Sequence, residues 1–343
     1  MGTNDAATPP PERERVTLGF IPLLDAVLLV VAREKGLFAD QGLDVNLSRE
    51  NAWSTLRDKL AAGLLDGAHL LAPLPLAMSL GLGRAPCDTL APATLSRNGN
   101  ALVLSTALCE RSGAAFDDDP AASARALAAW LAASPRQRRP RLAMVYPYSC
   151  QHFLLRDWLA CGGLAPERDL DLVALPPPRM VAALREGQID GFCVGEPWGS
   201  LAQHDGVGRI VASGAQLWPE HPEKVLGVTR PWAHRYPGTL AALLRALQAA
   251  SDWLAESPAH RRQARDWLAL PPYLDRSVSH LETLPLAEAP IHQRLFGGDL
   301  LCPDLAALGR IADAVASQAG QPLNRKTLEA CYTPVHYQAA LHR

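Results

Sequence analysis

Short apolar runs alternate with amphipathic segments over the first ninety residues. The apolar runs have the length of strands, and the segments between them show the 3.6-residue periodicity of helices. Strands are predicted over 16–22, 43–47 and 68–72, and helices over 25–35 and 53–62. Pro73 stands where proline opens a first helical turn. This alternation predicts parallel βαβ units.

A second, smaller set of the same kind follows. Two strand-like pieces flank a turn-forming cluster at 97–100. Further strands are predicted over 141–146, 170–175 and 191–194, and helices over 151–161 and 180–186. From Pro231 onward the pattern is almost entirely helical.

Two α/β lobes with a helical C-terminal tail fit a clamshell in which the second lobe is inserted into the first. Lobe I is expected over 15–105 and 225–343, lobe II over 106–224, and a disordered segment over 1–14. The junctions between strands and helices then face one cleft, where helix N-termini favour a small anion.

Composition narrows the function classes. The 343 residues are 48% apolar and 20% charged, with 33 Lys plus Arg against 35 Asp plus Glu, a formal charge of −2. This balance argues against a nucleic-acid surface spread over the protein. Only four of the basic residues are lysines, so the role of each can be considered separately. They are Lys35, Lys59, Lys224 and Lys326.

The N-terminal segment, the apolar runs and the cysteines together predict a cytoplasmic protein. Residues 1–14 are polar and proline-rich, without the apolar region of a signal peptide, and no apolar stretch reaches the length of a membrane helix. The seven cysteines form an odd set without CxxC or zinc-ligand spacing, so neither disulfides nor a metal site are expected.

Covalent catalysis is not favoured. Cys150 and His152 flank Gln151 at a strand-to-helix junction, but residues two apart on a helix point about 200° apart and do not easily hydrogen-bond. The chain has no GxSxG, HExxH, Walker A or GxGxxG motif. We therefore expect no catalytic residues and no cofactor.

Three stretches carry a family resemblance. They are GFIPL at 19–23 with RDKLAAG at 57–63, DGAHLLAP at 66–73, and GQIDGFCVGEPW at 187–198. Over about Val16 to Trp232 the chain resembles the nitrate and bicarbonate substrate-binding proteins of ABC transporters. Within them it is most similar to the cytoplasmic nitrate/nitrite sensor NasS.

The resemblance implies a type II periplasmic-binding-protein fold and a set of anion ligands. The implied ligands are Trp53, Asn100, the Gly195 backbone NH, Lys224, and either Gln151 or His152. The family's histidine falls on Gln151 by strict spacing, with His152 one residue later. We favour Gln151, because a one-residue slip rotates a helical side chain by about 100°.

The chemistry of these residues agrees with a nitrate ligand. Nitrate is a planar monoanion without a proton to donate, so it needs a positive charge, in-plane donors and a flat wall. Lys224 brings a charge and three donors, whereas bicarbonate favours an acceptor for its proton. Each residue also fits an ordinary role: Trp53 in packing, Asn100 in a turn and Lys224 at the surface.

The resemblance implies a cytosolic sensor that binds nitrate or nitrite and has no catalytic step. Ligand-free, it would hold an ANTAR-type antiterminator (NasT type), and anion binding would release that partner. The sensor itself is expected to touch neither nucleic acid nor membrane. The alternatives are the receptor of a nitrate or bicarbonate transporter and an enzyme on the same fold, such as a thiamine-pyrimidine synthase.

Overall fold

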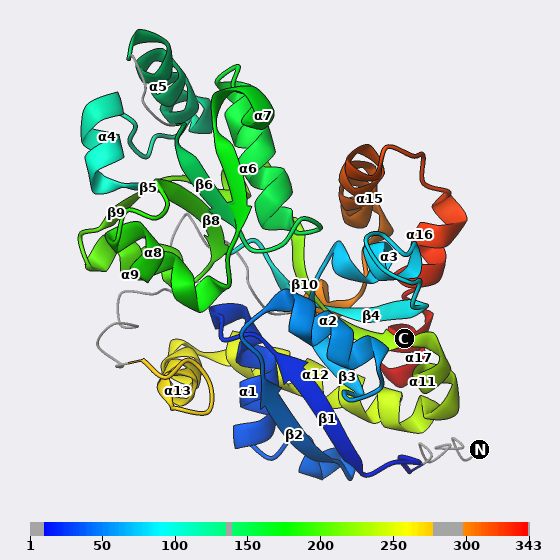
Figure 1. Cartoon of the computed structure of the whole chain (residues 1–343). Coiled ribbons are helices and arrows are strands. Elements are labelled where there is room, and N and C mark those ends of the chain that lie inside the picture. Colours follow the sequence, from blue (N-terminus) through cyan, green and yellow to red (C-terminus); the bar gives the residue numbers. More distant parts are fainter. Residues whose placement is uncertain (1–9, 135–138, 277–297, 342–343) are drawn as a thin grey trace.

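The computed structural model describes residues 10–134, 139–276 and 298–341, which form two α/β lobes (Figure 1). The first sheet has the strand order β2-β1-β3-β10-β4 and the second β7-β6-β8-β5-β9. The strands of the first sheet are β1 (Arg15–Phe20), β2 (Asp44–Arg49), β3 (Gly67–Leu71), β4 (Thr89–Arg97) and β10 (Pro222–Thr229). Those of the second are β5 (Asn100–Ser105), β6 (Arg141–Met144), β7 (Asp171–Ala174), β8 (Gly191–Gly195) and β9 (Gly208–Ser213).

The expected parallel βαβ units are present in both sheets, but each sheet also contains a reversed strand and is therefore mixed. β1 runs parallel to β2 and β3, but β10 lies antiparallel between β3 and β4. In the second sheet β5 is likewise antiparallel to β8 and β9. The reversed strands β5 and β10 are the ones that enter each lobe from the other lobe.

The passages between lobes differ from the expected boundaries by several residues. Asn100–Ser105 pairs in the second sheet, and Pro222–Lys224 lies in the first. If each lobe is defined by its sheet, the first boundary between the lobes lies at 98–99 instead of 105/106. The second boundary lies within 214–221 instead of at 224/225. The turn-forming residues at 98–99 join two sheets instead of closing a hairpin.

Helices pack on both sheets. Those that follow the strands are α1 (Val27–Glu34), α2 (Trp53–Ala61), α3 (Leu74–Ser79), α4 (Thr106–Ser112), α5 (Pro120–Ala133), α6 (Cys150–Cys161), α7 (Pro166–Asp169), α8 (Met180–Arg185), α9 (Trp198–His204) and α10 (Gly214–Leu217). The C-terminal ones are α11 (Arg230–Arg235), α12 (Pro237–Glu256), α13 (Pro258–Ala269), α15 (Leu305–Ala319), α16 (Arg325–Cys331) and α17 (Val335–Leu341).

The helical C-terminal region belongs to the core. The apolar face of α12 packs with β1 and α1 in one hydrophobic cluster. From α15, Arg310 lies 3.7 Å from Asp157 and 4.7 Å from the Trp218 ring, both in the second lobe. The C-terminal region therefore contacts both lobes.

Part of the N-terminal segment, from residue 10 onward, belongs to the described structure. Residues 1–9 of the expected disordered stretch lie outside the described residues. The Glu12 carboxylate accepts hydrogen bonds of 2.9 Å from the backbone N–H groups of Gly238 and Thr239, at the start of α12. An acid at a helix N-terminus satisfies free N–H groups there. The expected disorder is therefore wrong for residues 10–14.

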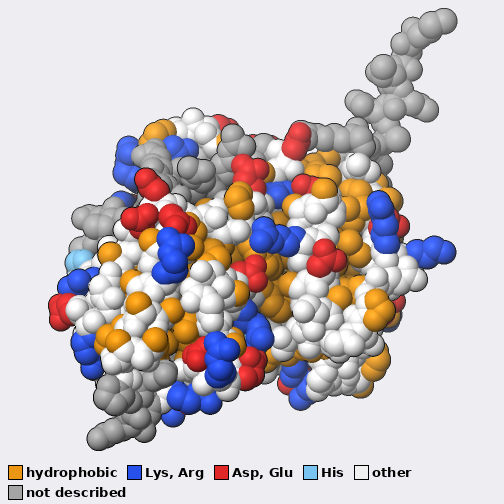
Figure 2. Space-filling model, turned by 90° about the horizontal axis from the view of Figure 1, so that it is seen from above, with side chains coloured by type: hydrophobic (Ala, Val, Ile, Leu, Met, Phe, Trp, Pro, Cys, Tyr) orange, Lys and Arg blue, Asp and Glu red, His pale blue; other side chains and the backbone are white. Residues whose placement is uncertain are grey.

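The surface carries both signs of charge. On the face in Figure 2, basic and acidic side chains are interspersed, in keeping with the formal charge of −2. Among the described residues, no helix is both long and apolar enough to cross a membrane.

Candidate functional site

Lys224 lies at the centre of a buried polar cluster between the lobes. It is fully buried in β10, where it pairs with Leu71 of β3 and Ser96 of β4. Its Nζ donates to Asp25 Oδ2 at 2.7 Å and to Glu223 Oε1 at 2.5 Å. The expectation of a surface role for this lysine, the ordinary alternative to ligand binding, is therefore wrong.

An irregularity in β10 allows this arrangement. Neighbouring side chains in a regular strand point to opposite faces. Here the pairing with β4 shifts register on both sides of Lys224, and such bulges re-aim side chains. The side chains of Glu223 and Lys224 can therefore contact each other, which the side chains of neighbouring residues in a regular strand cannot do.

The Glu223 carboxylate accepts hydrogen bonds from Lys224 of the first lobe and from two side-chain amides of the second lobe. Asn100 Nδ2 donates to its Oε2 at 2.7 Å, and Gln151 Nε2 donates to its Oε1 at 2.5 Å. Gln151 Nε2 also lies 2.7 Å from Asn100 Oδ1. Asn100 begins β5 and Gln151 stands in the first turn of α6, so both amides come from the second lobe.

Asp25 completes the charged group from the first lobe. It lies in the 3-10 turn Leu24–Ala26 after β1, and its Oδ1 is 3.1 Å from His69 Nε2 of β3. Asp25 and Glu223 are almost completely buried, as is His69.

Lys224 fixes the charge states of this cluster. Burial alone would raise the pKa of both carboxyls, but the adjacent ammonium holds the pKa of Asp25 and of Glu223 below their ordinary values. Burial opposes the charge of Lys224, yet the two carboxylates raise its pKa to about 12. Two carboxylates against one ammonium leave a net charge of −1, before any histidine takes up a proton.

Trp53 and Gly195 border the cluster. Trp53, the first residue of α2, has its ring 5.6 Å from Lys224 Nζ. Its indole N–H is buried and has no hydrogen-bond partner among the described residues. A Cβ built on Gly195 would lie 3.7 Å from both Asn100 Oδ1 and Asp25 Oδ2. Five predicted residues, Trp53, Asn100, Gln151, Gly195 and Lys224, are therefore brought together.

His152 does not join them. Its Nδ1 lies 2.6 Å from the Pro147 carbonyl oxygen, and its ring stacks on Phe153. Burial lowers the pKa of His152. Of the two alternatives at the start of α6, the structure places Gln151 in the cluster and His152 outside it.

Sequence reasoning missed the acidic half of the cluster. Asp25 and Glu223 were not proposed, nor was His221, whose Nε2 is 3.4 Å from Glu223 Oε2. The sequence did contain a signal for these acids. Asp25 closely follows the first predicted strand, and Glu223 directly precedes Lys224, a predicted ligand.

Cys150, His221 and Glu223 form a group with metal-ligand chemistry. One ligand atom from each lies within 4.8 Å of the others, and all three residues are buried. The Glu223 carboxylate, however, already accepts from two amides and from the Lys224 ammonium. Burial also raises the pKa of the Cys150 thiol well above its ordinary value, which disfavours the thiolate that a metal needs.

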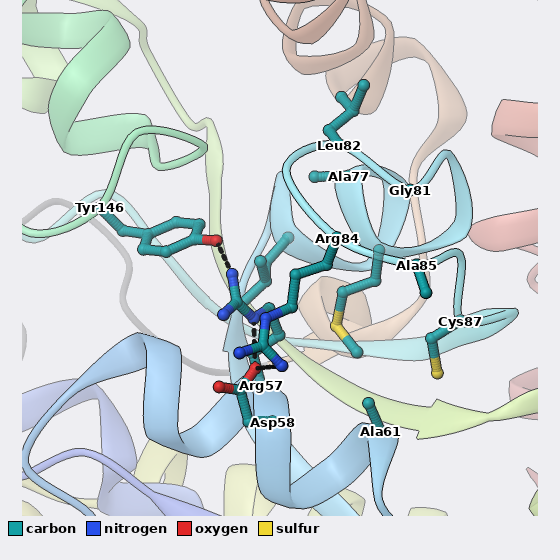
Figure 3. A pocket seen from close by; sticks show the side chains of 12 residues that line it. Arg57, Asp58, Ala61, Ala77, Gly81, Leu82, Arg84, Ala85, Cys87 and Tyr146 are labelled. Carbon is teal, nitrogen blue, oxygen red and sulfur yellow. Dashed lines mark hydrogen bonds and ion pairs between the residues drawn. The ribbon is translucent and has the colours of Figure 1, made fainter.

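The lobes also touch beside the cluster. Arg57 of α2 hydrogen-bonds the hydroxyl of Tyr146 in the second lobe and lies over its ring, and both residues line a small hollow of about 20 Å³ (Figure 3). Asp58 binds both Arg57 and Arg84. The Leu24 N–H donates to the Glu196 carbonyl at 2.7 Å. The Arg57–Tyr146 and Leu24–Glu196 contacts join the two lobes.

A family model described as NMT1-like matches residues 9–269. The chain belongs to the NMT1-like family. It is 42% identical over 272 residues to the nitrate import ATP-binding protein NrtC of Synechocystis sp., and 39% identical over 273 residues to the bicarbonate transport ATP-binding protein CmpC of Synechococcus elongatus. Each match covers 79% of this chain but only 39% and 40% of the relative, so the chain spans about two fifths of their length.

The fold agrees with a solved member of this group. The crystal structure of the periplasmic nitrate-binding protein NrtA from Synechocystis superposes with a TM-score of 0.87 at 26% identity, covering 97% of this chain and 90% of that one. This confirms the expected two-lobed periplasmic-binding-protein fold.

Proposed function

We propose that the chain binds nitrate or nitrite between its two lobes and performs no catalytic step. The observation that carries this proposal is the coordination of a planar carboxylate, that of Glu223, by Asn100, Gln151 and Lys224. Nitrate has the same trigonal shape and also only accepts hydrogen bonds. The similarity to a protein named as nitrate-binding supports this ligand class.

Trp53 and Gly195 extend the same proposal. The Trp53 indole N–H is a buried donor without a partner among the described residues, and a buried unsatisfied donor is costly unless a ligand accepts from it. Gly195 carries no Cβ between Asn100 and Asp25, which leaves room for an anion against the backbone.

We further propose that the protein is a cytosolic sensor of the NasS kind. Ligand-free, it would hold an ANTAR-type antiterminator, and nitrate would release that partner without the sensor contacting nucleic acid. Linkage requires that nitrate weaken partner binding by the factor by which the partner weakens nitrate binding. This part rests on the sequence resemblance to NasS.

A transport receptor is the second candidate. The relatives named for nitrate import and bicarbonate transport favour it. The two roles differ in the partner: a receptor delivers its anion to a permease, whereas a sensor releases an antiterminator.

Calorimetric titration of nitrate, nitrite and bicarbonate tests the ligand class. We expect nitrate or nitrite to bind, and Lys224→Ala and Gln151→Met to weaken binding at least tenfold. Lys59→Ala is the matched control, because Lys59 also pairs with a carboxylate, Glu50 at 2.6 Å, but is 39% exposed. Nitrate binding that survives in Lys224→Ala would exclude the proposed site.

The partner role is tested separately. The full chain is mixed with an ANTAR-type antiterminator, and complex formation is measured by size-exclusion chromatography with and without saturating nitrate. We expect the complex only without nitrate. Equal complex in both conditions would refute the switch and leave the ligand assignment standing.

A further inference from the structure

The donors expected to bind an external anion are occupied by a side chain of the protein itself. We infer that Glu223 is a built-in competitor: its carboxylate fills the anion position in the ligand-free protein, and a planar anion binds by displacing it. The inference rests on the proposed function, because it assigns the occupant that this anion must replace.

A count of N–H groups supports displacement. A side-chain amide has two N–H donors. Those of Gln151 face Asn100 Oδ1 and Glu223 Oε1, and those of Asn100 face Glu223 Oε2 and, at 3.3 Å, His221 Nε2. Both amides are therefore fully used while Glu223 is in place.

Few donors then remain for a second anion. The Lys224 ammonium has three N–H groups, of which Asp25 and Glu223 take two. The third Lys224 N–H and the Trp53 indole N–H are then the only donors left on these two side chains. A nitrate with three acceptor oxygens gains the amide donors only when the Glu223 carboxylate leaves them.

Charge leads to the same conclusion. With Asp25 and Glu223 ionised against Lys224, and with His69 and His221 neutral beside them, the buried cluster has a net charge of −1, and an added anion would make it −2. Desolvated like charges repel strongly. Moving the Glu223 carboxylate out of the cluster restores −1, so exchange of one anion for another avoids this cost.

The exchange has a consequence for the lobes. The bonds from Asn100 and Gln151 to Glu223 run from the second lobe to the first. The carboxylate therefore holds the lobes together as a bound anion would. Binding of the external anion is then expected to change the position of Glu223 and of the adjoining start of β10 more than the separation of the lobes.

Truncation of Glu223 tests the inference without depending on nitrate. Glu223→Ala removes a fragment equivalent to acetate, and the free ion can then bind in its place. We expect sodium acetate to raise the melting temperature of Glu223→Ala by several degrees more than equimolar sodium chloride does, and to have no such effect on the wild type. Asp25→Asn is the matched control, since it removes a Lys224 partner that contacts neither amide.

Nitrate titration gives the second readout. We expect Glu223→Ala to bind nitrate at least tenfold more tightly than the wild type. The volume-conserving Glu223→Gln should also bind more tightly, because its amide N–H groups would face the donors of Gln151 and Lys224. If Glu223→Ala does not fold, the nitrate affinity of Glu223→Gln still tests the inference.

The outcomes separate the two proposals. Acetate rescue of Glu223→Ala without nitrate binding in any variant would support the inference and refute the proposed function. Nitrate binding to the wild type that is equal or weaker in Glu223→Gln, with no acetate effect on Glu223→Ala, would overturn the inference and leave the proposed function intact.

Discussion

Replacing Lys224 with methionine removes a buried cation and keeps most of the side-chain volume. Two carboxylates, Asp25 and Glu223, then lose their only adjacent lysine, from distances of 2.7 and 2.5 Å. Removing one partner from a buried ion pair costs about 3–5 kcal/mol, because the remaining charge stays desolvated. We expect a loss of this size in the free energy of unfolding at pH 7.5.

The dependence on pH identifies the cause. In the wild type the pKa of Lys224 is raised to about 12, so its contribution is complete below its ordinary pKa and is lost as pH rises through 12. The lowered pKa values of Asp25 and Glu223 make their contribution complete above the ordinary values and lost at lower pH. In Lys224→Met the unpaired carboxyls favour protonation, so the deficit should shrink as pH falls toward 5.

Urea unfolding followed by circular dichroism at pH 7.5 and pH 5 measures both effects. Lys59→Met is the matched control: the Lys59 side chain is 39% exposed, although its partner Glu50 is only 7% exposed, so solvent screens this pair more than the Lys224 cluster and a smaller loss is expected. Adding Asp25→Asn and Glu223→Gln to Lys224→Met should restore most of the stability. A loss in Lys224→Met no larger than in Lys59→Met would refute the account of the cluster.

Three other variants test separate features. Gly195→Ala should change stability by less than about 1 kcal/mol, because its nearest contacts are 3.5 Å or longer, but weaken nitrate binding at least tenfold in calorimetry; unchanged affinity would place the anion elsewhere. Glu196, whose pKa burial raises to about 7, favours its neutral form, so the contribution of this one group to stability is greatest below pH 4.5 and is lost as pH rises through 7. Glu196→Gln should remove that loss and stabilise the protein at pH 8 by on the order of 3 kcal/mol in urea unfolding; an unchanged pH profile would contradict the assignment. Tyr146→Phe removes the hydroxyl that Arg57 binds and should lower the free energy of unfolding by about 1 kcal/mol, measured by urea unfolding. Tyr148→Phe is its control, and equal effects of the two would argue against the contact.

Periodicity predicted much of the fold, but it missed the strand that carries the central lysine. Most strands of both lobes follow runs of apolar residues, as at 68–72 for β3. β10 begins with Pro222, Glu223 and Lys224 and contains Gly227, so its sequence resembles a surface loop. Its strand conformation depends on pairing with β3 and β4, which are distant in sequence.

The candidate site was predicted from its donors but not from its acceptors. Trp53, Asn100 and Lys224 match a motif that an anion requires. An isolated carboxylate repels nitrate, so an acid such as Glu223 is not expected at an anion site. This expectation does not hold where a buried ammonium pairs with the acid and lowers its pKa. That pairing depends on the fold and is invisible in the local sequence.

The paired strands at the lobe junction make the second lobe a removable module. Arg97 and Pro222 are Cα partners in the pairing of β4 with β10, and the Asn98 N–H donates to the His221 carbonyl at 3.0 Å. A two-residue hairpin turn can therefore join these strands directly. The intervening segment also starts and finishes on neighbouring strands, with Ala101 opposite Ser213. An insertion at this junction could therefore replace the second lobe, and a deletion could remove it. Neither change would alter the strand order of the first sheet.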